Sequence, residues 1–253
     1  MDIKTINNFL WWIPFKEIRG YLKNAVSQNV ILNNKCSFLK TTIEKNNNIN
    51  FISQFDQDFL AYLYFNGKRN GFFVDIGAYD GVDISNTYLF EQLGWNGICI
   101  EADPNNFQLL KKNRKCDCYN LAMHSKSDEK LEFITSSNAS TLNVLKSQAS
   151  DSHIERMKSA ENQKELKTIK VNSITFNDFM SRNYPDIKYI DFLSIDIEGG
   201  ELIALKTIDF NKYSFGLITV ENNFEEGVLI NFMKEKGYKV LIDIGLDILF
   251  IKE

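Results

Sequence analysis

The stretch VDIGAYDGVDISNT, residues 74–87, combines a short apolar strand, a glycine loop and the start of a helix. The apolar run stops at Gly77, and the polar triplet Ser85-Asn86-Thr87 is typical of a helix N-terminus. A glycine loop between a strand and a helix presents backbone N–H groups to a ligand, and loops of this kind hold nucleotides. The stretch therefore predicts a nucleotide site in an α/β protein.

Strand and helix signals alternate along the chain from this stretch onward. Such alternation predicts a parallel sheet with helices on both faces. The last two strands meet at Gly245 as a hairpin, so one terminal strand is expected to be antiparallel. The expected strands are GFFVDIG, NGICIEAD, CDCYNLAM, KLEFITS, TIKVNSI, YIDFLSIDIEG, FGLITVENN, YKVLIDIG and DILFIKE.

The pattern predicts two parts of unequal size. Residues 1–50 form a helical appendage that ends in the polar linker EKNNNIN, and residues 51–253 form the main domain. Within the main domain, the polar stretch of about residues 136–167 is expected to be a helical insertion outside the core.

Ligands of parallel α/β sheets bind at the carboxyl ends of the strands. Five expected strand ends carry polar residues or glycine, which makes this edge of the sheet the predicted site. The five ends are Asp75 to Gly81, Glu101 to Asp103, Ala122 to His124, Asp196 to Gly199, and Glu221 to Asn223.

The loop chemistry favours S-adenosylmethionine over a dinucleotide. The G-x-G-x-x-G fingerprint is absent, and Asp80 and Asp83 would repel a pyrophosphate at the helix N-terminus. S-adenosylmethionine carries a sulfonium and an ammonium instead of phosphates, so acidic groups suit it. Glu101 follows about 20 residues beyond the loop, where an acid accepts hydrogen bonds from ribose hydroxyls.

Composition argues against a nucleic-acid partner. The chain has 253 residues, 29 Lys and Arg against 33 Asp and Glu, and a net charge of −4, so nucleic acid is not an expected partner. The four cysteines form no C-x-x-C pair and are expected to be reduced thiols of a cytoplasmic protein. A small-molecule acceptor and a homo-oligomer are expected.

The N-terminal segment of residues 9–22 is aromatic and basic. Its apolar run is too short for a membrane span and contains Pro14. Two interpretations are open: a helix packed on the domain or on a partner subunit, and a segment resting weakly on a membrane surface.

Four motifs together resemble the FkbM family of S-adenosylmethionine-dependent methyltransferases. They are FVDIGAYDGVDISNT, GWNGICIEADPNNFQLLKKNR, DFLSIDIEGGELIALKTIDF and ITVENN, in this order and spacing, preceded by SQFDQDFL. The resemblance implies a class I methyltransferase fold, Rossmann-like, with a seven-stranded mostly parallel sheet. It also implies methyl transfer to a hydroxyl oxygen, often of a sugar or natural product.

The resemblance also implies which residues bind the cofactor. Tyr79 stands where the general pattern D-x-G-x-G-x-G has its middle glycine, and Gln57 is expected either over the cofactor or on a helix surface. By matching position, the methionine end is assigned to Asp75, Gly77, Ala78, Gly81, Ser85, Asn86 and Thr87, the ribose to Glu101 and Ala102, and adenine to Ala122 and Met123, with Tyr79 and Asp196 also counted as cofactor contacts.

Neighbouring strand ends carry candidate catalytic groups. Asp196 ends one strand, and Glu221 and Asn222 end the next, which gives an all-oxygen set suited to Mg²⁺. The arrangement is similar to the metal site of catechol O-methyltransferases. The other interpretation is that Asp196, Glu221 and Asn222 bind cofactor or acceptor directly, with no metal.

The proton of the acceptor hydroxyl needs a base, and two residues are candidates. Glu198 points to the same rim as Asp196 and is either functional or a cap of the next helix. His153 lies in the polar insertion and becomes a candidate only if the insertion folds over the site.

The sequence as a whole favours an O-methyltransferase acting on a sugar, with the nucleotide-activated form included, in bacterial surface polysaccharide biosynthesis (capsule or lipooligosaccharide). Two alternatives stay open: O-methylation of another small natural product, and a non-catalytic nucleotide-binding protein of the same fold.

Overall fold

The computed structural model describes residues 34–136, 138, 140–162, 166–223 and 227–253. The chain divides into two compact units between Phe51 and Ile52, one residue beyond the boundary expected from the sequence. In the first unit, residues 34–47 are helical, and the expected contact segment of residues 9–22 lies outside the described residues. None of the described helices has both the length and the apolar character needed to cross a membrane.

The second unit is built on a seven-stranded sheet in the order β10-β11-β9-β8-β1-β2-β3. Neighbouring strands are parallel except at β11, which is antiparallel to both β9 and β10. This confirms the predicted seven-stranded, mostly parallel sheet with an antiparallel terminal strand. The strands are β1 (Phe72–Ile76), β2 (Asn96–Glu101), β3 (Asp117–Asn120), β8 (Tyr189–Ile195), β9 (Ser214–Glu221), β10 (Tyr238–Ile244) and β11 (Asp247–Lys252).

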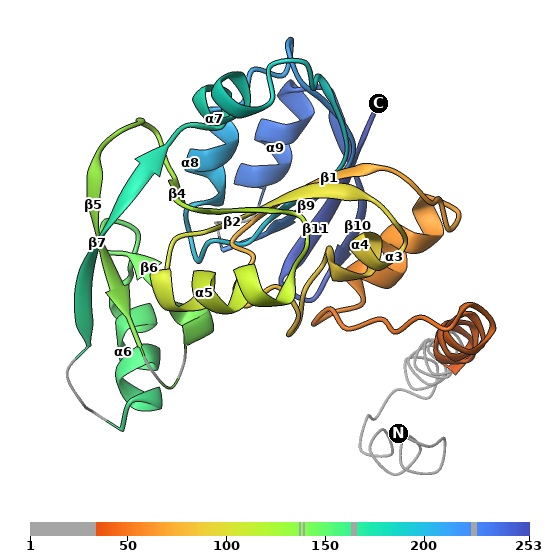
Figure 1. Ribbon diagram of the computed structural model, residues 1–253, viewed down its shortest axis with the longest axis horizontal. Helices are drawn as coiled ribbons and strands as arrows, with labels where there is room; N and C mark the ends of the chain where they lie inside the picture. The colour runs from red at the N-terminus through yellow and green to blue at the C-terminus, as the bar shows by residue number, and fades with distance from the viewer. Residues whose placement is uncertain (1–33, 137, 139, 163–165, 224–226) are drawn as a thin grey trace, which may run out of the picture. The chain divides into compact units, whose positions relative to one another are not determined.

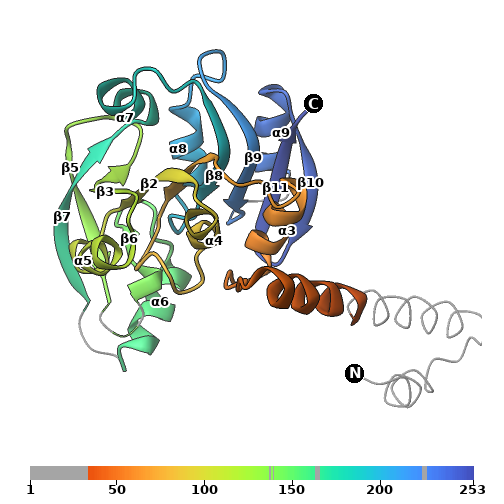
Figure 2. The same ribbon diagram turned by 45° about the vertical axis from the view of Figure 1, so that its right-hand side comes forward.

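Helices cover both faces of this sheet (Figures 1 and 2). One face carries α3 (Gln57–Tyr64), α4 (Tyr88–Gln92) and α5 (Pro104–Asn113). The other face carries α7 (Phe176–Asn183), α8 (Glu201–Lys206) and α9 (Val228–Glu235). Because both faces are covered, the central strands are buried and mainly apolar, as in β1, whose buried residues 73–76 include one polar residue, Asp75.

A second sheet of four strands, which the sequence analysis did not anticipate, stands beside β2 and α5 (Figure 1). Its order is β4-β7-β5-β6, with β4 (Ala122–Met123), β5 (Lys130–Thr135), β6 (Val144–Leu145) and β7 (Lys167–Ile174). The expected strand CDCYNLAM is in fact two strands, since β3 belongs to the central sheet and β4 to the second sheet.

The predicted helical insertion of residues 136–167 is therefore only partly helical. It contains the short turn η1 (Ser140–Leu142), the strand β6 and the helix α6 (Asp151–Ala160). Val144 and Met157 are fully buried in a small cluster with Ile134, which packs α6 against the second sheet. This packing holds α6 beside the carboxyl ends of the central strands.

Candidate functional site

A cavity of about 190 Å³ lies at the carboxyl ends of the central strands, the edge predicted from the sequence. It is formed by the ends of β1, β2, β4, β8 and β9 and by the segment between β5 and α6. Thirteen of the residues singled out from the sequence line it. They are Asp75, Gly77, Ala78, Tyr79, Ser85, Asn86, Glu101, Ala102, Ala122, Met123, Asp196, Glu198 and Glu221.

The glycine loop after β1 is shaped by close approach of the chain to β8. Gly77 has a φ of +89°, and a Cβ at this position would lie 1.6 Å from the backbone oxygen of Asp196. Glycine is therefore required at this position for steric reasons as well as for its backbone conformation. Tyr79 also has a positive φ, of +51°, and its backbone N–H donates to Glu101 Oε2 at 2.9 Å.

Glu101 joins the loop to the end of β2. Its Oε2 accepts from Tyr79, and its Oε1 accepts from the backbone N–H of Asp103 at 2.7 Å. Burial nevertheless raises the pKa of Glu101 to about 8. A carboxyl group fixed at both oxygens beside a cavity is suited to receive ribose hydroxyls.

A buried arginine, Arg114, stabilises the glycine loop through hydrogen bonds and was not predicted as a site residue. Arg114, at the end of α5, donates from Nη1 to the backbone oxygen of Gly81 at 3.1 Å and from Nε to Glu91 at 2.9 Å. Its Nη1 and Nη2 also donate to Thr87 Oγ1, which donates to Asp75 Oδ2 at 2.5 Å. Burial still raises the pKa of Asp75, against the lowering effect of Arg114.

Two expected cofactor contacts belong to this supporting network and do not line the cavity. Thr87 is fully buried against Asp75 and Arg114. Gly81 packs on α5, where a Cβ would lie 2.6 Å from Leu110 and Arg114. Both residues lie between β1 and α4, but they contact Arg114 and do not face the cavity.

Gln57 is likewise not on the cavity wall. Its Nε2 donates to Asp247 Oδ2 at 2.6 Å, and its Oε1 accepts from the backbone N–H of Phe55. Gln57 therefore ties α3 to β11, and the neighbouring Gln54 lines the cavity instead. The two glutamines lie three positions apart in the same motif. The sequence does not show which of them lines the cavity.

Ser85 and Asn86 remain at the cavity. Ser85 Oγ accepts from the backbone N–H of Tyr88 at 3.1 Å and so begins α4. Asn86 Nδ2 donates to Ser194 Oγ at 3.1 Å, while its Oδ1 is buried without a hydrogen-bond partner. A buried acceptor without a partner on a cavity wall is suited to bind a donor such as an ammonium group.

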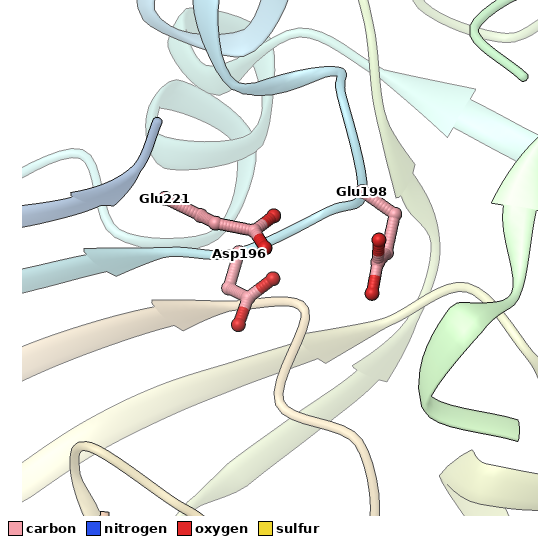
Figure 3. A group of neighbouring side chains, drawn as sticks. All are labelled: Asp196, Glu198 and Glu221. Carbon is pink, nitrogen blue, oxygen red and sulfur yellow. The ribbon is translucent and has the colours of Figure 1, made fainter. Parts of the chain in front are cut away.

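Three carboxyl groups gather at the end of the cavity formed by β8 and β9 (Figure 3). Asp196, Glu198 and Glu221 each place a carboxylate oxygen within 4.8 Å of the others. Asn222, which was expected to complete this set, does not line the cavity, and its backbone N–H donates to Leu246. Asn222 follows Glu221 directly in an extended chain, so the two side chains point to opposite faces.

Burial and mutual repulsion keep protons on these carboxyl groups. Burial, with the adjacent Glu221, raises the pKa of Asp196 well above its ordinary value. Burial and Asp196 raise the pKa of Glu198 to about 8, and burial and Glu198 raise the pKa of Glu221 to about 8. Carboxyl groups with pKa values near neutrality are suited to accept a proton during a reaction.

Glu201 organises the loop that carries Glu198. Its Oε1 accepts from the backbone N–H groups of Ile197 at 2.9 Å and Gly199 at 3.0 Å. Glu201 thus performs the helix-capping role that the sequence left open for Glu198. Glu198, with a φ of +56°, is free to face the cavity.

The inserted segment places His153, on α6, beside Glu198. His153 Nε2 lies 2.7 Å from the backbone oxygen of Leu142, and its Nδ1 lies 3.7 Å from Glu198 Oε2. The condition set for His153, that the insertion folds over the site, is thus met in the structure. The other histidine, His124, does not line the cavity.

Among solved structures, the chain is similar to several methyltransferases at low sequence identity. The methyltransferase FkbM of Methylobacillus flagellatus is 14% identical over 76% of this chain and 47% of that chain, with a TM-score of 0.44. A TehB-like S-adenosylmethionine-dependent methyltransferase of Corynebacterium glutamicum is 11% identical over 91% of this chain and 100% of that chain, with a TM-score of 0.40. TrmK of M. capricolum, solved with S-adenosylhomocysteine, is 11% identical over 80% of this chain and 68% of that chain, with a TM-score of 0.37.

No protein of curated function matches the sequence. The family model of the methyltransferase FkbM domain does match, over residues 75–240, which is more than half of the chain. The matched residues begin at Asp75 on β1 and include the loop, Glu101 and the three clustered carboxyl groups. Together with the class I methyltransferase topology of the sheet, this match identifies the protein as an S-adenosylmethionine-dependent methyltransferase that belongs to the FkbM family.

Proposed function

We propose that the protein transfers the methyl group of S-adenosylmethionine to a hydroxyl oxygen of a sugar. The observation that carries the proposal is the cluster of Asp196, Glu198 and Glu221 at one end of the cavity, with His153 beside Glu198. An alcohol must lose its proton as it attacks the methyl group, and these groups can accept one.

The chemistry of the cavity walls supports a proposed position for the cofactor. Glu101 would bind the ribose hydroxyls, and the unpaired Asn86 Oδ1 would accept from the ammonium of the methionine moiety. Ala122 and Met123 offer an apolar wall for adenine. The sulfonium would then lie toward Asp196, whose raised pKa a nearby positive charge would lower.

In the transfer, the acceptor oxygen attacks the methyl carbon while the carbon–sulfur bond breaks and its electron pair passes to sulfur. The sulfonium becomes the neutral thioether of S-adenosylhomocysteine, and the hydroxyl proton goes to Glu198. His153, 3.7 Å from Glu198, is placed to receive that proton or to hold the carboxylate in position. The rest of the rate enhancement comes from aligning oxygen, carbon and sulfur.

The role of Glu198 predicts a specific pH dependence. Since its carboxyl group has a pKa of about 8 in the ligand-free protein, it is mostly protonated at neutral pH. We expect kcat/KM for the cofactor to rise with pH with a midpoint near pH 8 and to level off above it. The kcat profile should have a lower midpoint, because the bound sulfonium and ammonium favour the ionised carboxylate.

Glu198→Gln should lose the pH dependence of kcat and lower kcat by about 10²-fold or more. His153→Gln should keep the pH dependence and lower kcat by a smaller factor. Glu155→Gln, on the exposed part of the same helix, is the matched control and should behave like the wild type. An unchanged profile in Glu198→Gln would assign the proton to another group.

The carboxyl cluster also fits a divalent cation, with Glu198 in place of Asn222. Asp196, Glu198 and Glu221 supply only oxygen donors, which suits Mg²⁺. A cation held there would favour the ionised form of an acceptor hydroxyl. The raised pKa values of these three groups are what closely spaced carboxyl groups show before a cation neutralises them.

If these carboxylates bind a cation, Mg²⁺ or Mn²⁺ should raise the melting temperature of the wild type, because a ligand that binds only the folded state stabilises it. The rise should vanish in Asp196→Asn and persist in Asp128→Asn, an exposed aspartate remote from the cavity. Full activity in a chelator, with no thermal response to either ion, would remove the metal from the proposal.

The sugar acceptor, including a nucleotide-activated sugar of bacterial surface polysaccharide synthesis, is the specific form of the proposal. Two polar residues of the segment between β6 and α6, Gln148 and Ser150, lie beside Glu198 and support it. O-methylation of another small natural product would use the same proton-accepting groups. A non-catalytic binding protein would not need the cluster of carboxyl groups with raised pKa values.

Calorimetry with S-adenosylhomocysteine and with NAD tests the cofactor. We expect S-adenosylhomocysteine to bind and NAD not to bind, because Asp83 lines the cavity and would repel a pyrophosphate. A second assay follows the release of S-adenosylhomocysteine in the presence of sugar acceptors. Binding without turnover for any hydroxylated acceptor would favour the non-catalytic alternative.

A further inference from the structure

A second cavity, of about 300 Å³, adjoins the first at the carboxyl cluster. Three residues, Gln148, Arg156 and Glu198, line both cavities, so a molecule in the second cavity would reach Glu198. Ser150, Ser152, His153 and Asn223 complete the polar part of its wall.

The side-chain amide of Gln148 has no partner within the described part of the chain. Both Oε1 and Nε2 are buried, and neither forms a hydrogen bond. The backbone of Gln148 is fixed by a hydrogen bond from its N–H to Leu145 at 2.8 Å. A Cβ at Gly200 would lie 2.6 Å from Oε1, so the chain after β8 leaves room for this amide only because residue 200 is glycine.

An unpaired buried amide of this kind destabilises the folded protein unless a ligand satisfies it. The amide offers one acceptor and two donor hydrogens at the boundary between the two cavities. A hydroxyl group, which both donates and accepts, is the chemical group that pairs with such an amide.

Arg156 supplies positive charge to the same wall. Its guanidinium forms no ion pair or hydrogen bond with the residues that the structure describes, although it is close enough to Glu198 to lower the pKa of that carboxyl. Arg156 lies on α6, whose first turn carries Ser152 and His153 on the same wall. A guanidinium without a protein partner in a cavity suits a carboxylate or phosphate.

We propose that the second cavity is the acceptor subsite, and that it takes a hydroxylated acceptor bearing an anionic group, with Gln148 binding a hydroxyl and Arg156 binding the anion. This assignment rests on the proposed function and adds the class of acceptor to it. Because Arg156 and Glu198 line the same cavity, an acceptor whose anion binds Arg156 would hold a hydroxyl of the same molecule near Glu198. The shared chemistry of the anion is a carboxylate or a phosphate.

The test uses the full chain saturated with S-adenosylhomocysteine and three probes that differ mainly in charge: glucose, glucuronate and glucose 1-phosphate. Titrations followed by saturation-transfer NMR give a dissociation constant for each. We expect at least one anionic probe to bind about tenfold or more tightly than glucose, as a charge-assisted hydrogen bond implies. The stronger of the two anionic probes distinguishes carboxylate from phosphate.

Arg156→Gln should remove the preference for the anionic probe, whereas Lys158→Gln should keep it. Lys158 is an exposed lysine of the same helix that does not line either cavity, so the two variants lose the same charge. Gln148→Leu should weaken the three probes by similar factors, since each offers hydroxyl groups.

A preference that survives Arg156→Gln would overturn the proposal, as would glucose binding as tightly as both anionic probes or no binding of any probe at millimolar concentration. The cofactor is measured separately. If S-adenosylhomocysteine does not bind, the proposed function fails, whereas the anion preference is still measurable in the ligand-free protein.

Discussion

Gly77→Ala is expected to destabilise the protein by about 2–5 kcal/mol and to abolish binding of S-adenosylhomocysteine. The new methyl group would lie 1.6 Å from the backbone oxygen of Asp196, and the residue would keep a φ of +89°. A left-handed conformation costs a non-glycine residue about 1–2 kcal/mol, and overpacking about 1–3 kcal/mol. Relief of the clash would separate the ends of β1 and β8 and deform the cavity between them.

The measurement is the free energy of unfolding in urea, together with calorimetry of the cofactor product. Gly237→Ala is the matched control, because Gly237 has a φ of +79° and a Cβ there meets nothing within 4 Å. It should lose only the backbone part of the stability and retain cofactor binding. Equal destabilisation by the two variants would show that the close approach to Asp196 is unimportant.

Glu101→Gln is expected to weaken binding of S-adenosylhomocysteine by about 10–100-fold, the factor for losing hydrogen bonds to a charged group. Both carboxylate oxygens already accept backbone N–H groups, from Tyr79 and Asp103. A glutamine amide has only one acceptor oxygen, so one of these N–H groups would face an amide N–H. The variant should therefore loosen the loop as well as lose ribose contacts.

Since the pKa of Glu101 is about 8, affinity of the wild type should increase with pH toward 8, with proton release on binding. Calorimetry in buffers of different ionisation enthalpy measures that proton release. The control is Glu132→Gln, an exposed carboxylate of the second sheet that does not line the cavity. Unaltered affinity in Glu101→Gln would place the ribose elsewhere in the cavity.

Local features of the site could be predicted from the sequence. The glycine loop and Glu101 are set by a strand, a turn and the next strand, which lie close together along the chain. The three carboxyl groups were also predictable as strand-end residues, because parallel strands bring their carboxyl ends to one edge. The family resemblance added the type of fold and the cofactor.

Long-range packing decided what could not be predicted. Thr87 was expected at the cofactor, but Arg114, 27 positions later in the sequence, draws it into a buried network beneath the loop. Gln57 is held by Asp247, 190 positions away. The second sheet could not be predicted because β4 and β6 have only two residues each, too few to show the alternation of a strand.

The signals for the missed residues were present but ambiguous. A basic residue at the end of a helix, such as Arg114, is ordinarily explained by the helix dipole. A glutamate just after a glycine pair, such as Glu201, is typical of any helix start, so its role in holding the loop could not be recognised. Gln148 lies in a polar stretch without any pattern, and only its burial beside Gly200 distinguishes it.

The proposed cofactor half and acceptor half of the site come from different segments of the chain. Glu101 and the glycine loop belong to the central sheet, whereas His153 and Arg156 belong to the inserted segment. If the proposed acceptor subsite is correct, a natural variant or chimera that exchanges the segment between β5 and β7 would redirect the enzyme to a new acceptor and leave the cofactor half unchanged. Such an exchange has to retain two junctions, the hydrogen bond of Ser140 to Tyr79 and that of Asn143 to Asp103.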